Sequence, residues 1–160
     1  GYGGSVGNRY RFLREIIQAV TKVMPPDRLL TVRLSDWGVV DMDVSLFGAK
    51  ENYQETIRLL SKEPIDAISV SAYDFRRPAL GTADTMARLT RAATQLPIMI
   101  CGKIYDRASA AEALQDADIA LSAKSMLLNP NWVEEVRQGK PLRLYESEEG
   151  NIAYTDTILL

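Results

Sequence analysis

The sequence has 160 residues, of which 46% are hydrophobic and 25% charged, and its formal net charge at pH 7 is −2. This length and apolar content suit one domain, or one piece of a larger one, with a substantial core. The small net charge gives no reason to expect a nucleic acid or an anionic membrane as a partner. No apolar run approaches the roughly 18 residues of a membrane span.

The numbers of histidine and cysteine residues limit the kinds of catalysis and metal binding that we expect of this chain. The sequence contains no histidine, so the commonest general base and the commonest metal ligand are absent from it, and we expect no metal site. Its single cysteine, Cys101, cannot form an internal disulfide, and no signal peptide is visible. We therefore expect a cytoplasmic protein in which Cys101 is a small buried hydrophobe rather than a reactive thiol.

The first predicted element is a helix. Its apolar residues recur at helical spacing and mark one wide face: Phe12, Leu13, Ile16, Ile17, Val20, Val23 and Met24. Pro25 and Pro26 end it. Read on its residues alone, the preceding segment 2–5 is a flexible loop with Ser5 near the helix start.

Four short apolar runs follow and predict strands near residues 29–34, 66–71, 98–101 and 118–121. Helical patterns separate them, at residues 53–61, in a segment that ends at Thr94 with Thr82 or Asp84 as its cap, and at residues 108–114. Such alternation predicts four parallel strands in the order of the sequence, with right-handed crossovers and helices on the outer face.

A long loop, residues 36–50, separates the first strand from the next helix. Trp37 and Phe47 lie in it among aliphatic and acidic residues, and this aromatic content favours a packed loop. Because the loop follows the C-terminal end of a strand, it suits a role near a substrate or a role in packing.

The third and fourth strands lead into a candidate ligand site. The third strand stops at Gly102, whose backbone can approach a ligand closely, and the fourth is followed by Ser122, Ala123 and Lys124. In (β/α)8 barrels the loops after the seventh and eighth strands commonly build a phosphate site. The alternative is an ordinary βαβ unit without a ligand, with Lys124 as a surface lysine.

Several segments together resemble one family. The run YGGSVGNRYRFLREII, residues 2–17, resembles the YGGS-x-ENR-x-RF-x-x-E segment of the old yellow enzyme family, the FMN-dependent NAD(P)H:flavin oxidoreductases and ene-reductases. Gly7 stands where the family usually has Glu. The resemblance continues in order through the run that ends Arg33-Leu34-Ser35, similar to the family's fifth strand, to about residue 139.

This resemblance implies an α/β fold, the C-terminal half of a (β/α)8 TIM barrel with helix four to helix eight and strands five to eight. Residues 1–140 would form the half-barrel with the FMN-phosphate loops, and residues 141–160 a C-terminal tail. In the family, strands one to four carry the flavin-ring contacts, the substrate-holding His pair or His-Asn pair and the proton-donating Tyr. The chain therefore resembles an enzyme fragment that is inactive alone, and we predict no catalytic residue in it.

The resemblance also implies the cofactor contacts. Arg33 would project into the barrel mouth toward the pyrimidine side of the flavin, where a fixed cation favours the reduced, anionic form. On its residues alone, an Arg salt-bridged inside the barrel is the alternative, because burying a lone cation is costly. The FMN phosphate would meet Gly102, Lys103, Ala123 and Lys124. Ala123 and Lys124 stand where the family has Gly and Arg, and Lys keeps the charge but loses the planar fork.

The implied reaction is hydride transfer from NADH or NADPH to FMN, and from FMN to an activated alkene or another small-molecule acceptor. A non-catalytic half-barrel module that binds phosphate or associates with itself is the alternative. The open edges of a four-stranded half-barrel predict self-association, or pairing with a missing N-terminal half.

Overall fold

The computed structural model describes residues 1–37 and 44–144. Within them, four strands form one sheet in the order β1-β2-β3-β4, and each neighbouring pair is parallel. The strands are β1 Thr31–Ser35, β2 Ala67–Ser71, β3 Ile98–Cys101 and β4 Ile119–Leu121. The predicted strands, their order and their parallel pairing are confirmed, with ends shifted by a residue or two.

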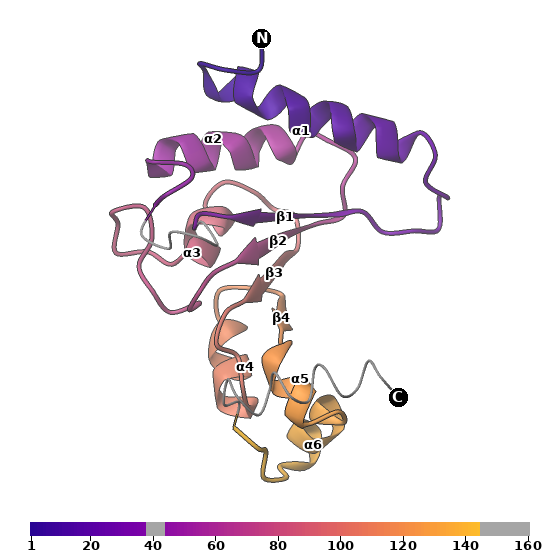
Figure 1. Ribbon diagram of the computed structural model, residues 1–160, viewed down its shortest axis with the longest axis vertical. Coiled ribbons are helices and arrows are strands. Elements are labelled where there is room, and N and C mark those ends of the chain that lie inside the picture. The colour runs from indigo at the N-terminus through magenta and orange to yellow at the C-terminus, as the bar shows by residue number, and fades with distance from the viewer. Residues whose placement is uncertain (38–43, 145–160) are drawn as a thin grey trace.

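The helices of the described residues are α1 Val6–Thr21, α2 Lys50–Leu60, α3 Met86–Arg91, α4 Arg107–Ala113, α5 Lys124–Leu128 and α6 Trp132–Gln138. The crossovers between successive strands are α2, α3 and α4. Figure 1 shows α1 and α2 at one end of the molecule, next to β1, and α4, α5 and α6 at the other end, next to β4. No described helix is long and apolar enough to cross a bilayer.

The starts of α1 and α3 can be compared with the helix caps predicted from the sequence. Ser5 caps α1 with its side chain, at the predicted place. The cap of α3 is Thr85, whose hydroxyl accepts a hydrogen bond from the N–H of Arg88 at 3.3 Å, so the prediction of Thr82 or Asp84 was wrong. The hydroxyl of Thr82 donates instead to a carbonyl within the preceding turn. Residues 82–85 include three side chains that can cap a helix, and the geometry of the turn decides which of them does so.

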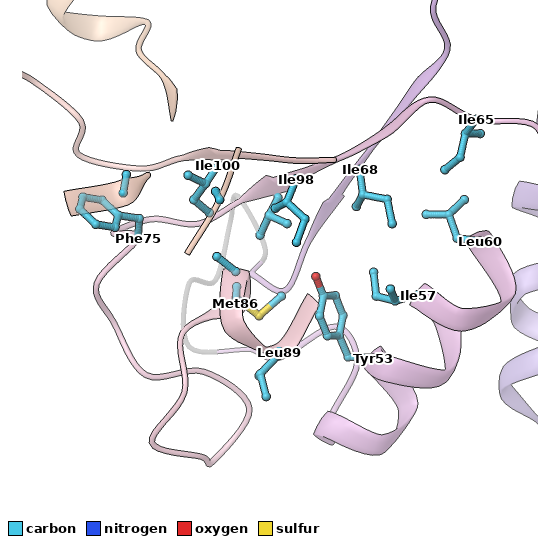
Figure 2. Packing of buried hydrophobic residues seen from close by; sticks show 14 of the residues in the cluster. Tyr53, Ile57, Leu60, Ile65, Ile68, Phe75, Met86, Leu89, Ile98 and Ile100 are labelled. Atoms are coloured by element: carbon cyan, nitrogen blue, oxygen red, sulfur yellow. The ribbon is translucent and has the colours of Figure 1, made fainter. Parts of the chain in front are cut away.

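The core lies between one face of the sheet and the crossover helices (Figure 2). Apolar side chains from alternate strand positions point at those of α2 and α3: Ile68, Ile98 and Ile100 against Tyr53, Ile57, Leu60, Met86 and Leu89. Val70 belongs to the same buried cluster. The buried hydroxyl of Tyr53 is satisfied by the equally buried Thr90 Oγ1 at 2.6 Å. The crossover helices therefore cover one face of the sheet, as predicted.

The opposite face of the sheet is open among the described residues. Strand register aligns one row across it, Arg33, Ser69, Met99 and Ile119, and a second row nearer the C-terminal ends, Ser35, Ser71, Cys101 and Leu121. Arg33 and Ile119 are exposed. In a closed barrel this face would point toward the barrel axis.

Two predicted features fall partly outside the described residues. They are positions 38–43 of the long loop and positions 145–160 of the C-terminal tail. The last described helix ends at Gln138, and the predicted boundary at residue 140 stays a prediction.

Candidate anion site at the strand ends

A cavity of about 240 Å³ opens at the C-terminal ends of β2, β3 and β4. Four of the five predicted cofactor-binding residues line it, namely Gly102, Lys103, Ala123 and Lys124. Arg33 is not among its lining residues, because it lies on β1 in the row farther from the strand ends. Parallel strands thus bring the two predicted phosphate loops together at one edge of the sheet.

The backbone atoms around Gly102 leave no room for a side chain at this position. Its φ is +128°, and a Cβ built on it would lie 2.3 Å from the carbonyl oxygen of Ala72. The backbone of the loop after β2 crosses here, since the N–H of Phe75 donates to the carbonyl of Gly102 at 3.2 Å and that of Ala72 to Cys101 at 3.2 Å. The close approach expected at this glycine is therefore made by the chain's own backbone, which forms one wall of the cavity.

Lys103 is held against the same loop. It has a left-handed φ of +55°. Its Nζ lies 3.5 Å from Oδ2 of Asp74 and 4.7 Å from the centre of the Tyr73 ring. Asp74 also faces the guanidinium of Arg76 at 4.0 Å. The Lys103 charge is thus shared between a carboxylate and a ring face, and it ties the loops after β2 and β3 together.

The wall of the cavity formed by the segment between β4 and α5 is held in place by hydrogen bonds to the loop after β3. Ser122 donates from Oγ to the carbonyl of Ile104 at 2.8 Å. The carbonyl of Tyr105 accepts from Ser125 Oγ at 3.1 Å and from Trp132 Nε1 at 2.8 Å. These bonds set the start of α5 beside the end of β3.

Ala123 and Lys124 stand at that start and are both exposed. Ammonium groups and a small side chain at a strand-end cavity suit the phosphate end of a cofactor. The volume is below the roughly 300–1,000 Å³ of a complete small-molecule site. The residues present therefore fit a phosphate group, while a flavin ring would need further walls.

Arg33 lies on the open face of the sheet. Its Nε donates to Ser69 Oγ at 3.3 Å, so its partner in the described part of the chain is a hydroxyl and not a carboxylate. The guanidinium is exposed toward the space that a closed barrel would enclose. This placement differs from the salt-bridged alternative considered for the sequence.

Several lining residues of the cavity were not among the site residues predicted from the sequence. Trp37, Tyr73 and Tyr105 contribute aromatic surface. Trp37 donates from Nε1 to the carbonyl of Ser71 at 3.2 Å, and its ring meets that of Tyr73 edge-on at 6.3 Å. Each of these aromatic residues follows a strand within a few positions, and that spacing is the signal that would have placed them at this edge.

The long loop after β1 borders a second cavity of about 330 Å³. The two cavities share Trp37, Ser71, Ala72 and Tyr73 as lining residues. From the loop, Asp36 and Val44 are also among the lining residues of the second cavity. The loop thus lies at the strand-end face, next to the candidate anion site.

Fold and site together define half of a (β/α)8 barrel with a cavity suited to phosphate at its strand-end face. The sequence profile of the NADH:flavin oxidoreductase / NADH oxidase family matches residues 1–143. The chain belongs to that family. The resemblance drawn from its sequence motifs is confirmed.

Two curated relatives illustrate the match. The NADPH dehydrogenase of Bacillus licheniformis is 31% identical over 141 residues, covering 82% of this chain and 39% of the relative. The 12-oxophytodienoate reductase 7 of Oryza sativa subsp. japonica is 27% identical over 158 residues, covering 90% and 40%. The chain spans about two fifths of the length of these relatives.

Solved structures show the same fold. Morphinone reductase in complex with tetrahydroNAD superposes with a TM-score of 0.74 at 23% identity, covering 97% of this chain and 42% of that one. The old yellow enzyme homologue from Zymomonas mobilis gives a TM-score of 0.75 at 23% identity, covering 97% and 45%. The predicted half-barrel is therefore confirmed.

Proposed function

We propose that this chain is the phosphate-holding part of an FMN-dependent NAD(P)H oxidoreductase of the old yellow enzyme type. The observation that carries the proposal is the convergence of four predicted residues, Gly102, Lys103, Ala123 and Lys124, on one cavity at the strand ends. Family membership supports a flavin in that place. The relatives named NADPH dehydrogenase support a nicotinamide cofactor as the electron donor.

Each of the four predicted residues that line the cavity has a part in holding FMN. Lys124 offsets the phosphate charge, and the methyl of Ala123 limits how near the phosphate comes to the chain. Gly102 lets the loop after β2 close the wall, and Lys103 adds positive potential from its place beside Asp74. FMN, when bound, supplies a centre that accepts and donates hydride.

Arg33 acts on the ring end of the cofactor. Its side chain is exposed and lies on β1, in the row of the open face that also holds Ser69. A fixed cation there stabilises negative charge on the pyrimidine side of a reduced flavin and so raises its tendency to accept electrons.

The chain alone is inactive in this proposal. It has no histidine, and none of its described residues is assigned to proton transfer or to holding a small-molecule substrate. Activity then requires four further strands, which come from a complementary half or from a second copy bound at the open sheet edges. We also propose a cytoplasmic location, with which a single cysteine is compatible.

A non-catalytic module that binds phosphate or associates with itself is the second candidate function. Among the residues that the structure describes, the open face of the sheet and its two unpaired edges favour it. A colourless preparation that binds inorganic phosphate would support this candidate. A yellow preparation with flavin absorbance would support the oxidoreductase.

Calorimetric titration with inorganic phosphate and with FMN tests the site. Lys124→Ala should weaken binding by about 1–3 kcal/mol, the range for losing a charge-assisted hydrogen bond. Lys62→Ala is the matched control, because this exposed lysine follows α2 and does not line the cavity. FMN should bind poorly to the chain alone, since the ring lacks most of its walls. Equal affinity in Lys124→Ala and the unmodified chain would remove Lys124 from the site.

A further inference from the structure

Four side chains of alternating charge connect the anion cavity to helix α4. Lys103 Nζ lies 3.5 Å from Oδ2 of Asp74, and Oδ1 of Asp74 lies 4.0 Å from Nη1 of Arg76. On its other side Arg76 donates from Nε to Oε2 of Glu112 at 2.8 Å, and its Nη2 lies 2.6 Å from the same oxygen. Lys103 lines the cavity, and Glu112 is exposed on α4. These four residues, here called the charge chain, therefore run from the cavity to the surface.

Asp74 is the most shielded member of the charge chain and is shared between two cations. Its side chain is 18% exposed, against 39% for Lys103, 41% for Arg76 and 47% for Glu112. The N–H of Arg76 donates to Oδ1 of Asp74 at 3.1 Å, so Oδ2 is the oxygen that faces Lys103. Because charges interact more strongly where water screens them less, the hold of Asp74 on Lys103 depends on how much of its charge Arg76 neutralises.

Glu112 competes with Asp74 for Arg76. Its carboxylate is within 2.8 Å of two guanidinium nitrogens, whereas that of Asp74 is 4.0 Å away. Glu112 raises the pKa of the Arg76 guanidinium, chiefly through their hydrogen bond, and Asp74 acts in the same direction with a smaller effect. The charge of Arg76 is therefore directed mainly to Glu112, and Asp74 keeps most of its own charge for Lys103.

Phe75 holds the backbone that carries Asp74 and Arg76. Its ring is buried in the core, and its N–H donates to the carbonyl of Gly102 at 3.2 Å. Neither contact depends on the ion pairs. Loss of one charge in the chain should therefore change how the remaining charges pair, while the loop after β2 keeps its path.

We propose that Arg76 and Glu112 are positioning residues of the anion site, which set through Asp74 how freely Lys103 turns to a bound phosphate group. A phosphate group competes with Asp74 for Lys103. Glu112 draws Arg76 away from Asp74 and so strengthens the hold on Lys103, whereas Arg76 weakens that hold. Loss of successive members should then change phosphate affinity with alternating sign. The role of these residues rests on the anion site of the proposed function and not on its flavin chemistry.

Two simpler roles of the Arg76–Glu112 pair lead to different results. If the pair only clamps the loop after β2 to α4, loss of either partner breaks the clamp, and both losses change phosphate affinity in the same direction. If Arg76 acts only through its electric field, loss of the next charge along the loop, Arg77, has a similar effect. Arg77 is exposed and lines the neighbouring cavity, so it is a matched control for the field.

Calorimetric titration of the full chain with inorganic phosphate at low salt tests the charge chain. Arg76→Gln should bind phosphate about two- to fivefold more weakly than the unmodified chain, and Glu112→Gln about two- to fivefold more tightly, as for partly exposed ion pairs. Arg77→Gln should change the affinity less than about twofold. In an Asp74→Asn background neither Arg76→Gln nor Glu112→Gln should have an effect, because the link to Lys103 is missing.

Urea unfolding gives a second measurement that needs no ligand. The midpoints of Asp74→Asn, Lys103→Met and the double variant give the interaction between the two side chains, and this interaction should be larger in an Arg76→Gln background. A smaller or equal interaction there would overturn the assignment.

Three outcomes of the titrations would also overturn it. They are changes of the same sign in Arg76→Gln and Glu112→Gln, equal effects of Arg76→Gln and Arg77→Gln, and effects that persist in the Asp74→Asn background. An unmodified chain that binds no phosphate would contradict the proposed function instead. The unfolding measurement would then decide whether Arg76 controls the pairing of Asp74 with Lys103.

Discussion

Substituting Gly102 with Ala tests whether the loop after β2 can pack against residue 102 only because glycine has no side chain. The added methyl would meet backbone atoms only: the Ala72 carbonyl oxygen at 2.3 Å, its carbon at 2.9 Å and the N–H nitrogen of Phe75 at 3.2 Å. No flexible side chain is available to move aside. The loop after β2 must therefore shift as a unit, away from the end of β3.

The cost has two parts. Holding an alanine at a φ of +128° costs about 1–3 kcal/mol, as for other rare backbone conformations. Moving the loop weakens the hydrogen bonds from Phe75 to Gly102 and from Ala72 to Cys101, each worth about 0.5–1.5 kcal/mol. We expect the free energy of unfolding to fall by about 2–6 kcal/mol, a large part of the usual 5–15 kcal/mol.

Urea unfolding followed by circular dichroism measures this loss. With a slope of about 2 kcal/mol/M, in the usual range for urea, the midpoint should move by about 1–3 M. Gly139→Ala is the control, because Gly139 has a φ of +67° with nothing within 4 Å of its added Cβ. That change should cost only the left-handed strain, about 1–2 kcal/mol. Equal losses in the two variants would refute the clash with the Ala72 carbonyl.

Two further predictions concern single carboxylates. Asp74→Asn frees Lys103 from the pair seen at 3.5 Å and removes a negative charge beside the cavity, so phosphate should bind about two- to tenfold more tightly at low salt; unchanged or weaker binding by calorimetry would contradict this. Folding lowers the pKa of Asp118 from 3.8, first through the N–H of Ile98 and then through Arg91. The unfolded chain then binds more protons, so stability should fall as the pH drops below about 4. Asp118→Asn should flatten this fall in acid-unfolding curves.

The strands and their order were predictable because the signals are local and repeated. Each strand is a short apolar run whose alternate side chains face the helices, such as Ile98 and Ile100 on β3. Parallel pairing was predicted because a helix lies between successive strands, and a helix in that position is the usual crossover connection between parallel strands. The cap of α3 was missed because Thr82, Asp84 and Thr85 are chemically similar, and the turn before the helix decides which of them is the cap.

The candidate site was predictable in its position and not in its contacts. Gly102 and Lys124 follow strand ends, and strand ends of a parallel sheet meet at one edge. That Lys103 pairs with Asp74 depends on how two loops cross, and no spacing in the sequence encodes it. The side-chain roles toward FMN stay predictions.

The pairing scheme of the sheet bears on how the chain reaches its fold. Every strand pairs with the strand next to it in sequence, and the stretch enclosed by each pairing shortens from β1–β2 to β3–β4. Closing a shorter stretch costs less conformational entropy, so after dilution from denaturant we expect the β3–β4 unit to form first. On the ribosome the β1–β2 unit is released first. The β3–β4 unit, whose strand ends border the anion cavity, is thus expected to form first in refolding, although the ribosome synthesises it last.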